Sequence, residues 1–115
     1  MEIRVIGFIP PIIGTEDEFN TFRIGEKLAK TLKVGEEVFL MDEKEKLVFG
    51  KARVEAIEVG KLGEMCLIHA HKNHTELAKD PNTASERLFK TIQRIYGPHI
   101  AEPHKKTTVL YLKRL

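Results

Sequence analysis

Apolar and polar residues alternate with a period of two in several parts of the chain, which is the spacing of a β-strand with one solvated face. The alternation is clearest around Val38 and Leu40 in residues 37–41, and along residues 47–59, where small apolar side chains alternate with charged ones. Alanines on the inward side of the long segment suggest the close approach of another sheet or backbone, as in a small barrel. Further strands are predicted at residues 2–9, 21–24 and 107–112.

Helical spacing of apolar residues appears later in the chain. Residues 62 to about 78 are predicted to form one helix, and a short helix is predicted at residues 26–32. The segment Thr83-Ala84-Ser85-Glu86 has the pattern of a capping box, in which a hydroxyl and a carboxylate each satisfy a free backbone donor. A single apolar stripe follows, and Gly97-Pro98 is a stop signal, so residues 83–96 are predicted to be a helix. We expect the whole stripe to be core: Leu88, Phe89, Ile92, Ile95 and Tyr96.

The predicted elements run strand, strand, short helix, two strands, two helices, strand. A small curved or barrel-like sheet with helices at one end would bury every apolar stripe, and the expected fold class is therefore α+β. Strands and helices do not alternate regularly, which argues against a doubly wound parallel sheet. We expect one domain spanning residues 1–115.

Composition narrows the classes of function. No apolar run approaches the ~20 residues needed to span a bilayer, so no membrane association is expected. The single cysteine, Cys66, allows no internal disulfide, and a cytoplasmic location fits best. The net charge of +2 is too small to indicate a protein that binds duplex DNA.

The chain resembles the ASCH domain family, within the PUA-like β-barrels, through the order and spacing of several segments. These are Thr21-Phe22-Arg23, the run from Leu32 to Val38, Ala56-Ile57-Glu58-Val59, Ile95-Tyr96-Gly97 and Val109-Leu110-Tyr111-Leu112. The resemblance implies a barrel of five or six mixed strands, with two helices, at about 62–78 and 83–96, inserted before the last strand. It also implies a module that binds RNA or a modified nucleotide in a cleft bordered by the strand of Arg23.

One branch of that family resembles acetylcytidine amidohydrolases, which are said to use a lysine, a threonine and a carboxylate. Thr21 matches the threonine, and the carboxylate would have to come from around Asp80. The expected lysine is missing, because Glu18 stands five positions before Arg23. Without it, nothing is obviously placed to activate a threonine hydroxyl, which is a poor nucleophile unaided. The sequence therefore favours a binding module, with Thr21 and Asp80 as the catalytic candidates if it is an enzyme.

Arg23 is the best candidate for ligand binding. It shares a strand with Asn20 and Thr21, and the planar guanidinium fork suits a phosphate or a base edge. The alternative is a structural ion pair with one of the nearby acidic residues, Asp17, Glu18 or Glu55.

Three further basic residues, Lys27, Lys51 and Arg53, are candidates for phosphate contacts. Glutamates interleave with them, so the alternative is a solvated face or lysines that protect an edge strand from pairing.

Cysteine and histidine side chains are common zinc ligands, and four of them lie close together in the sequence: Cys66, His69, His71 and His74. Their spacing along the predicted helix argues against a zinc site. At ~100° per residue, one helix cannot converge all four side chains on a single ion. We expect no metal and no cofactor, with Cys66 in the core and the histidines at the surface or in a cleft. A cleft histidine could then act as a general base.

The predicted function is a module that binds RNA or a modified nucleotide beside Arg23. One alternative is a small amidohydrolase acting on a modified nucleoside such as acetylcytidine. A second is a protein-interaction module without a ligand.

Overall fold

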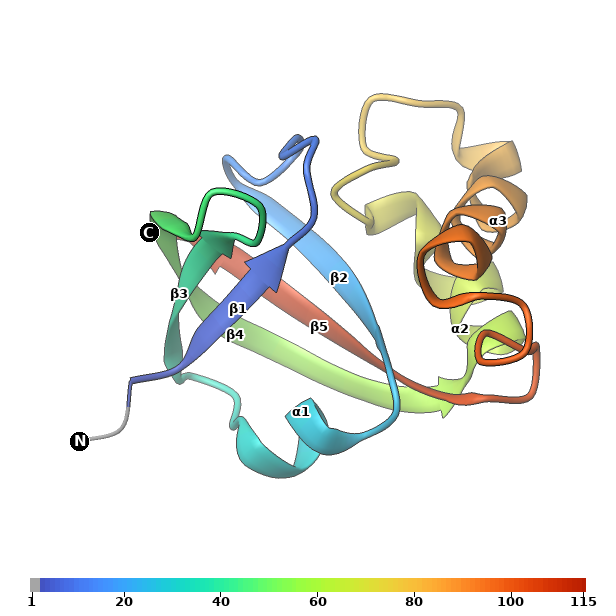
Figure 1. Cartoon of the computed structure of the whole chain (residues 1–115), viewed down its shortest axis with the longest axis horizontal. Helices are drawn as coiled ribbons and strands as arrows, with labels where there is room; N and C mark the ends of the chain where they lie inside the picture. Colours follow the sequence, from blue (N-terminus) through green and yellow to red (C-terminus); the bar gives the residue numbers. More distant parts are fainter. Residues whose placement is uncertain (1–2) are drawn as a thin grey trace.

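A strongly curled five-stranded sheet forms the body of the protein in the computed structural model, which describes residues 3–115 (Figure 1). The strands lie in the order β1-β3-β4-β5-β2. β1 pairs with β3 in parallel and the other neighbours pair antiparallel, so the sheet is mixed. The bounds are β1 Val5–Phe8, β2 Glu18–Ile24, β3 Glu37–Asp42, β4 Leu47–Lys61 and β5 Lys106–Arg114. Part of the first predicted strand, Glu2, lies outside the described residues.

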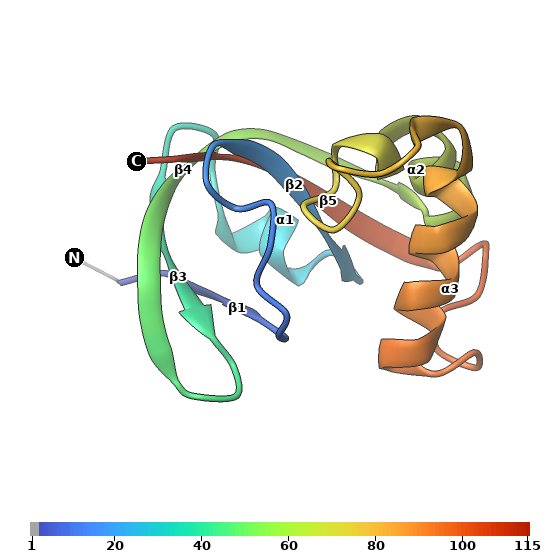
Figure 2. The same cartoon turned by 90° about the horizontal axis from the view of Figure 1, so that it is seen from above.

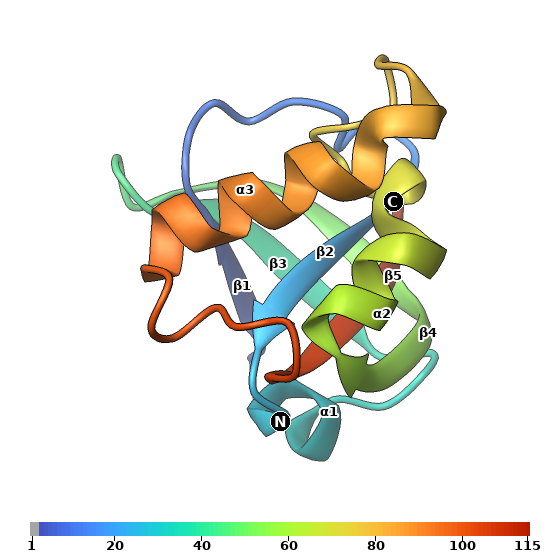
Figure 3. The same ribbon diagram turned by 90° about the vertical axis from the view of Figure 1, so that its right-hand side faces the viewer.

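The helices are inserted before the last strand, apart from one short helix between β2 and β3. They are α1 Lys27–Thr31, α2 Leu62–His69, the 3-10 turns η1 Ala70–Lys72 and η2 Pro81–Thr83, and α3 Ala84–Tyr96. Figure 2 shows α2 and α3 together at one side of the curled sheet, and Figure 3 shows α3 in front of β1 and β2. The predicted fold class is confirmed: a small α+β domain with a half-barrel sheet and two helices before the final strand.

Two apolar clusters hold these parts together. The first fills the concave side of the sheet and includes Phe8, Phe19, Val38, Leu40 and Leu112. The second lies between the sheet and the helices and includes Phe22, Leu62, Cys66, Leu88 and Ile92. Because side chains alternate along a strand, β2 contributes Phe19 to one cluster and Phe22 to the other.

The first inserted helix is shorter than predicted. It ends at His69 with one further 3-10 turn to Lys72, and residues 73–80 are turns rather than helix. Asn73 forms an isolated parallel bridge with Asn20 of β2, so the backbone leaves the helix to reach the sheet. The Asn73 side chain also accepts hydrogen bonds from Thr75 N and Oγ1, at 3.0 and 2.7 Å, which favours a turn.

The predicted capping box is wrong. Thr83 is the N-cap residue of α3, but its side chain makes no capping hydrogen bond. The chain enters the helix through a 3-10 turn, and the Thr83 hydroxyl instead contacts Asp80 O and accepts from Arg87 Nη1. The cap with side-chain support lies one turn earlier, where Asp80 accepts from Asn82 N at 3.0 Å.

The strict alternation predicted for the long strand holds only in part. Ala52 and Val54 are fully buried, but the pairing of β4 with β5 shifts register between Val54 and Ala56, and Ala56 is only partly buried. A bulge of this kind bends a strand and increases its twist, which helps one long strand to curl the sheet.

No helix within residues 3–115 is both long and apolar enough to cross a membrane.

Candidate functional site

A cleft of about 320 Å³ lies where the curled sheet does not close on itself. β1 and β2 are the two edge strands, and both line it, together with α3 and the turn that follows η1. The lining residues are Gly7 to Pro11, Thr21 to Arg23, Asn73 to Thr75, and Leu88, Thr91, Ile92, Arg94, Ile95 and Tyr96. Most of these are apolar, and the set contains two arginines and no Asp, Glu or Lys. The cleft is therefore an apolar hollow with positive charge.

Arg23 is the most deeply placed charge of the cleft. Its Nε donates to Thr21 Oγ1 at 3.2 Å, and its Cζ lies 5.0 Å from the centre of the Phe8 ring. The structural ion pair considered from the sequence does not form, because no carboxylate of residues 3–115 lies within 4 Å of this guanidinium. The neighbouring Glu43 carboxylate pairs with Lys46 Nζ at 2.7 Å instead.

Burial lowers the pKa of Arg23 from its ordinary value, and the nearby Tyr96 and Glu43 act in the opposite direction. An arginine starts from so high a pKa that it stays cationic at neutral pH. Within residues 3–115, its two terminal nitrogens have no hydrogen-bond partner. Every side-chain nitrogen of this range that lacks a partner is reached by solvent. Arg23 therefore presents two donor nitrogens, each with two N–H groups, to the cleft.

His74 is the second polar group held firmly in the cleft. Its Nδ1 lies 3.1 Å from the carbonyl oxygen of Ile13. Its ring meets the rings of Phe8 and Phe19 edge-on, with centroids 5.2 and 6.1 Å apart. Burial lowers the pKa of His74 to about 4, and the Arg23 charge adds to this effect, so the imidazole is neutral at pH 7.

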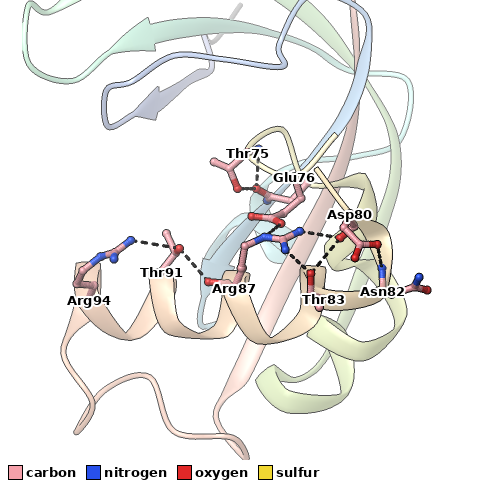
Figure 4. A network of polar contacts seen from close by, with 9 residues as sticks. Thr75, Glu76, Asp80, Asn82, Thr83, Arg87, Thr91 and Arg94 are labelled. Carbon is pink, nitrogen blue, oxygen red and sulfur yellow. Dashed lines mark hydrogen bonds and ion pairs between the residues drawn. The ribbon is translucent and has the colours of Figure 1, made fainter. Parts of the chain in front are cut away.

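The turn that carries His74 is tied to α3 by a partly buried ion pair (Figure 4). Arg87 Nε lies 2.7 Å from Glu76 Oε1, and the Glu76 side chain is 2% exposed. Arg87 also donates from Nη2 to Asp80 O at 2.7 Å and from Nη1 to the Thr83 hydroxyl. One guanidinium thus fixes both ends of the turn relative to the helix that forms the opposite wall.

The structure brings together some of the residues proposed from the sequence and separates others. Thr21 and Arg23 line the cleft. Asn20 lies on the other side of β2, buried, where its Nδ2 donates to His69 O at 2.8 Å. Asp80 is exposed and accepts from Asn82 N, away from the cleft lining.

The basic residues Lys27, Lys51 and Arg53 do not line the cleft. Lys27 is exposed on α1. Lys51 Nζ lies 2.7 Å from Glu37 Oε1, and Arg53 Nε lies 3.5 Å from Glu55 Oε2. Both pairs are solvent-exposed on the sheet and lie outside the cleft lining.

Three of the four metal-ligand candidates occupy separate environments, and the fourth, His71, is exposed. Cys66 is in the core, and burial raises the pKa of its thiol to about 12. His69 Nδ1 lies 2.6 Å from the Tyr111 hydroxyl, and His74 faces the cleft. No three His, Cys, Asp or Glu side chains gather into a metal-binding group within the described range.

Sequence reasoning missed the contribution of α3. The stripe predicted to be core divides in two: Leu88 and Ile92 are buried, whereas Ile95 is 50% exposed and lines the cleft with Thr91 and Arg94. Within its last turn, Tyr96 still packs against the second cluster, whereas Ile95 turns to the open cleft. The only signal was the run of polar Thr91 and Arg94 beside the stripe, which a solvated helix face would show equally.

Comparison with known proteins supports the fold but points to no particular activity. No family model matches the chain, and no curated protein matches it. The structure of hypothetical protein PH0355 is similar over 99% of this chain and 100% of its own, with a TM-score of 0.69 and 15% identity. Protein EF3133 from Enterococcus faecalis V583, with family model DUF984, is similar over 90% of this chain with a TM-score of 0.59 and 8% identity. The chain spans 64% of the length of EF3133. The fold is therefore shared with proteins whose names carry no function.

Proposed function

We propose that the chain is a cytoplasmic, ASCH-like and PUA-like module that binds RNA or a modified nucleotide in the cleft between β1, β2 and α3. The observation that carries the proposal is the unpaired guanidinium of Arg23, which lines a hollow that contains no acidic side chain. A partly buried cation without a carboxylate partner costs free energy, because the charge loses water and gains no counter-charge. An anionic ligand would supply that counter-charge.

The rest of the cleft fits a nucleotide better than a bare anion. Its volume of about 320 Å³ falls in the range of small-molecule sites. Tyr96 and the adjoining Pro10 and Pro11 present apolar surfaces on which a base can lie. Arg94, at the end of α3, adds a second guanidinium for a phosphate outside the deep part of the cleft.

Titration of the purified protein with a fluorescent nucleoside monophosphate, and with a short single-stranded RNA, tests the proposal. Arg23→Ala should weaken binding of both at least tenfold, since charged hydrogen bonds contribute about 1.5–3 kcal/mol. Lys90→Ala is the matched control, because it removes one positive charge from an exposed position of α3 outside the cleft lining.

Two further results decide the outcome. Affinity for RNA should fall steeply as salt is added, whereas the effect of Lys90→Ala should be small. Equal weakening by Arg23→Ala and Lys90→Ala would show nonspecific attraction and overturn the proposal. Arg53→Ala separately reports whether a longer RNA reaches the basic pairs on the sheet.

The amidohydrolase alternative needs an activated Thr21. The Thr21 oxygen accepts a hydrogen bond from Arg23, and the cleft lining includes no lysine or carboxylate that could take its proton. Turnover of free acetylcytidine that is lost in Thr21→Val would favour the enzyme. If the protein neither binds nor converts any of these ligands, the remaining candidate is an interaction module without a ligand.

A further inference from the structure

We propose that His74 is a specificity-determining hydrogen-bond acceptor in the cleft, which selects nucleotides whose base carries an amino group. This inference rests on the proposed function and adds to it the chemical class of the base. Arg23 supplies charge, which any nucleotide can satisfy, whereas His74 reads one atom of the base edge.

The hydrogen bond to Ile13 fixes the tautomer of His74. A carbonyl oxygen can only accept, so Nδ1, 3.1 Å from Ile13 O, must carry the proton. In a neutral ring, Nε2 then holds a lone pair and can only accept a hydrogen bond. Burial and the Arg23 charge keep the ring neutral, with a pKa of about 4.

The acceptor nitrogen is open rather than used within the protein. His74 Nε2 has no partner among the described side chains or backbone groups. Because no side-chain nitrogen of the described residues is both buried and without a partner, Nε2 is reached by solvent. Because His74 itself lines the cleft and its other nitrogen is turned to Ile13, Nε2 is the polar atom that it offers to a ligand.

The ring also cannot turn away easily. Its centroid lies 5.2 Å from that of Phe8 and 6.1 Å from that of Phe19, both edge-on, and both phenylalanines are buried. Gly14 lies against the backbone carbonyl of His74, close enough that an added Cβ would be 2.0 Å from that oxygen. The side chain and the backbone of His74 are thus both held in place, as a group that selects ligands by hydrogen-bond geometry must be.

Phe8 contacts both the acceptor, His74, and the cation, Arg23, and so holds them close to each other. The Arg23 Cζ lies 5.0 Å from the Phe8 ring centre, and the His74 ring centre lies 5.2 Å from it. A ligand that contacts both must carry an anionic group and, within the span of one nucleotide, a hydrogen-bond donor. The exocyclic amino groups of cytosine and adenine are such donors, whereas uracil and hypoxanthine present a carbonyl at the same position.

Two matched pairs of nucleotides test this inference in the full chain: cytidine with uridine 5′-monophosphate, and adenosine with inosine 5′-monophosphate. The wild-type protein should bind the amino-bearing member of at least one pair about tenfold more tightly, because the carbonyl analogue leaves Nε2 facing another acceptor.

Two substitutions separate the acceptor from the fold. His74→Asn places an amide near the position of Nδ1 and can keep the bond to Ile13, but it lacks the distant acceptor, so the preference within a pair should disappear. His74→Gln places its amide oxygen near the position of Nε2 and should keep part of the preference. Thermal unfolding of both variants shows whether the fold is intact.

The outcomes distinguish this inference from the proposed function. If wild-type protein binds both members of each pair equally and Arg23→Ala weakens both, the role of His74 is wrong and nucleotide binding stands. If no nucleotide or RNA binds at all, both proposals fail. A preference that survives in His74→Asn also overturns the role of His74, because another group must then read the base.

Discussion

The guanidinium of Arg23 lies over the ring of Phe8, with Cζ 5.0 Å from the ring centre, and no carboxylate of residues 3–115 pairs with it. The electrons of the ring offset part of the charge, by about 0.5–2 kcal/mol for contacts of this kind. Its terminal nitrogens have no hydrogen-bond partner in the described part of the chain. Such an arrangement stabilises the protein less than a paired arginine would, and it leaves the cation available.

Arg23→Met should therefore leave the free energy of unfolding unchanged or raise it by up to about 1 kcal/mol, because it removes a partly buried charge and keeps the apolar stem. Chemical denaturation of the ligand-free protein measures this. Arg114→Met is the matched control, because Arg114 also lies over a phenylalanine but donates to Thr15 O and Phe49 O, at 2.8 and 2.7 Å. The control should lose about 2 kcal/mol. A larger loss in Arg23→Met than in Arg114→Met would make Arg23 a structural residue.

His74 should make stability depend on pH between about 4 and 6.5. Its folded-state pKa is lowered to about 4 from an ordinary 6.5, so the unfolded chain takes up a proton first as the pH falls. The stabilisation is complete above pH 6.5 and is lost as the pH falls toward 4, with a total on the order of 2–3 kcal/mol. Denaturation of the wild type and of His74→Asn at pH 4, 5, 6 and 7 measures the difference between their slopes. Resolved titration of the His74 ring by NMR near pH 6.5 would contradict the prediction.

Gly14→Ala should destabilise the protein more than Gly35→Ala. Both glycines have positive φ, +70° and +94°, so each substitution costs about 1 kcal/mol of backbone strain. An added Cβ at Gly35 meets nothing within 4 Å, whereas at Gly14 it would lie 2.0 Å from His74 O. Because this neighbour is backbone, it can move only with the cleft wall, and we expect at least about 2 kcal/mol of further loss. Equal Tm values for the two variants would show that the loop yields freely.

Removing one partner of the partly buried pair between Glu76 and Arg87 should be costly. Arg87→Met leaves the Glu76 carboxylate, 2% exposed, without its counter-charge, and we expect a loss of about 3 kcal/mol. The double variant with Glu76→Gln should recover more than 1 kcal/mol of that loss, which a double-mutant cycle from denaturation curves reveals. Additive single effects would mean that the pair does not anchor the turn.

Local patterns were enough to predict most of the elements and the fold class. The period-two runs around Val38 and Leu40 became β3, and the apolar stripe and the Gly97-Pro98 signal placed α3 within one residue at its start. These succeeded because alternation and stop signals act between residues that are neighbours in the sequence. The capping box failed because the Thr83 hydroxyl donates to Asp80 O and accepts from Arg87 Nη1 instead of accepting from the helix backbone. Both contacts depend on the path of a 3-10 turn.

The residues of the candidate site likewise fall into those that local sequence could indicate and those that it could not. Thr21 and Arg23 could be chosen from the sequence because a guanidinium beside a short hydroxyl on a strand has a recognisable chemistry, and both do line the cleft. The contributions of Pro10, Arg94 and Ile95 could not be chosen, because they come from segments about 70 to 90 positions apart that meet only across the open edge of the sheet.

By itself, the sequence determined the order and type of most strands and helices, and that Arg23 is a candidate cation beside Thr21. Only the tertiary structure decided that, within residues 3–115, this cation lacks a carboxylate partner and His74 turns one nitrogen to Ile13 and leaves the other free. It also decided that β1 and β2 remain apart. The physical reason is that hydrogen-bonded periodicity is a local property, whereas burial, charge pairing and the hollow between two edge strands depend on how distant segments pack.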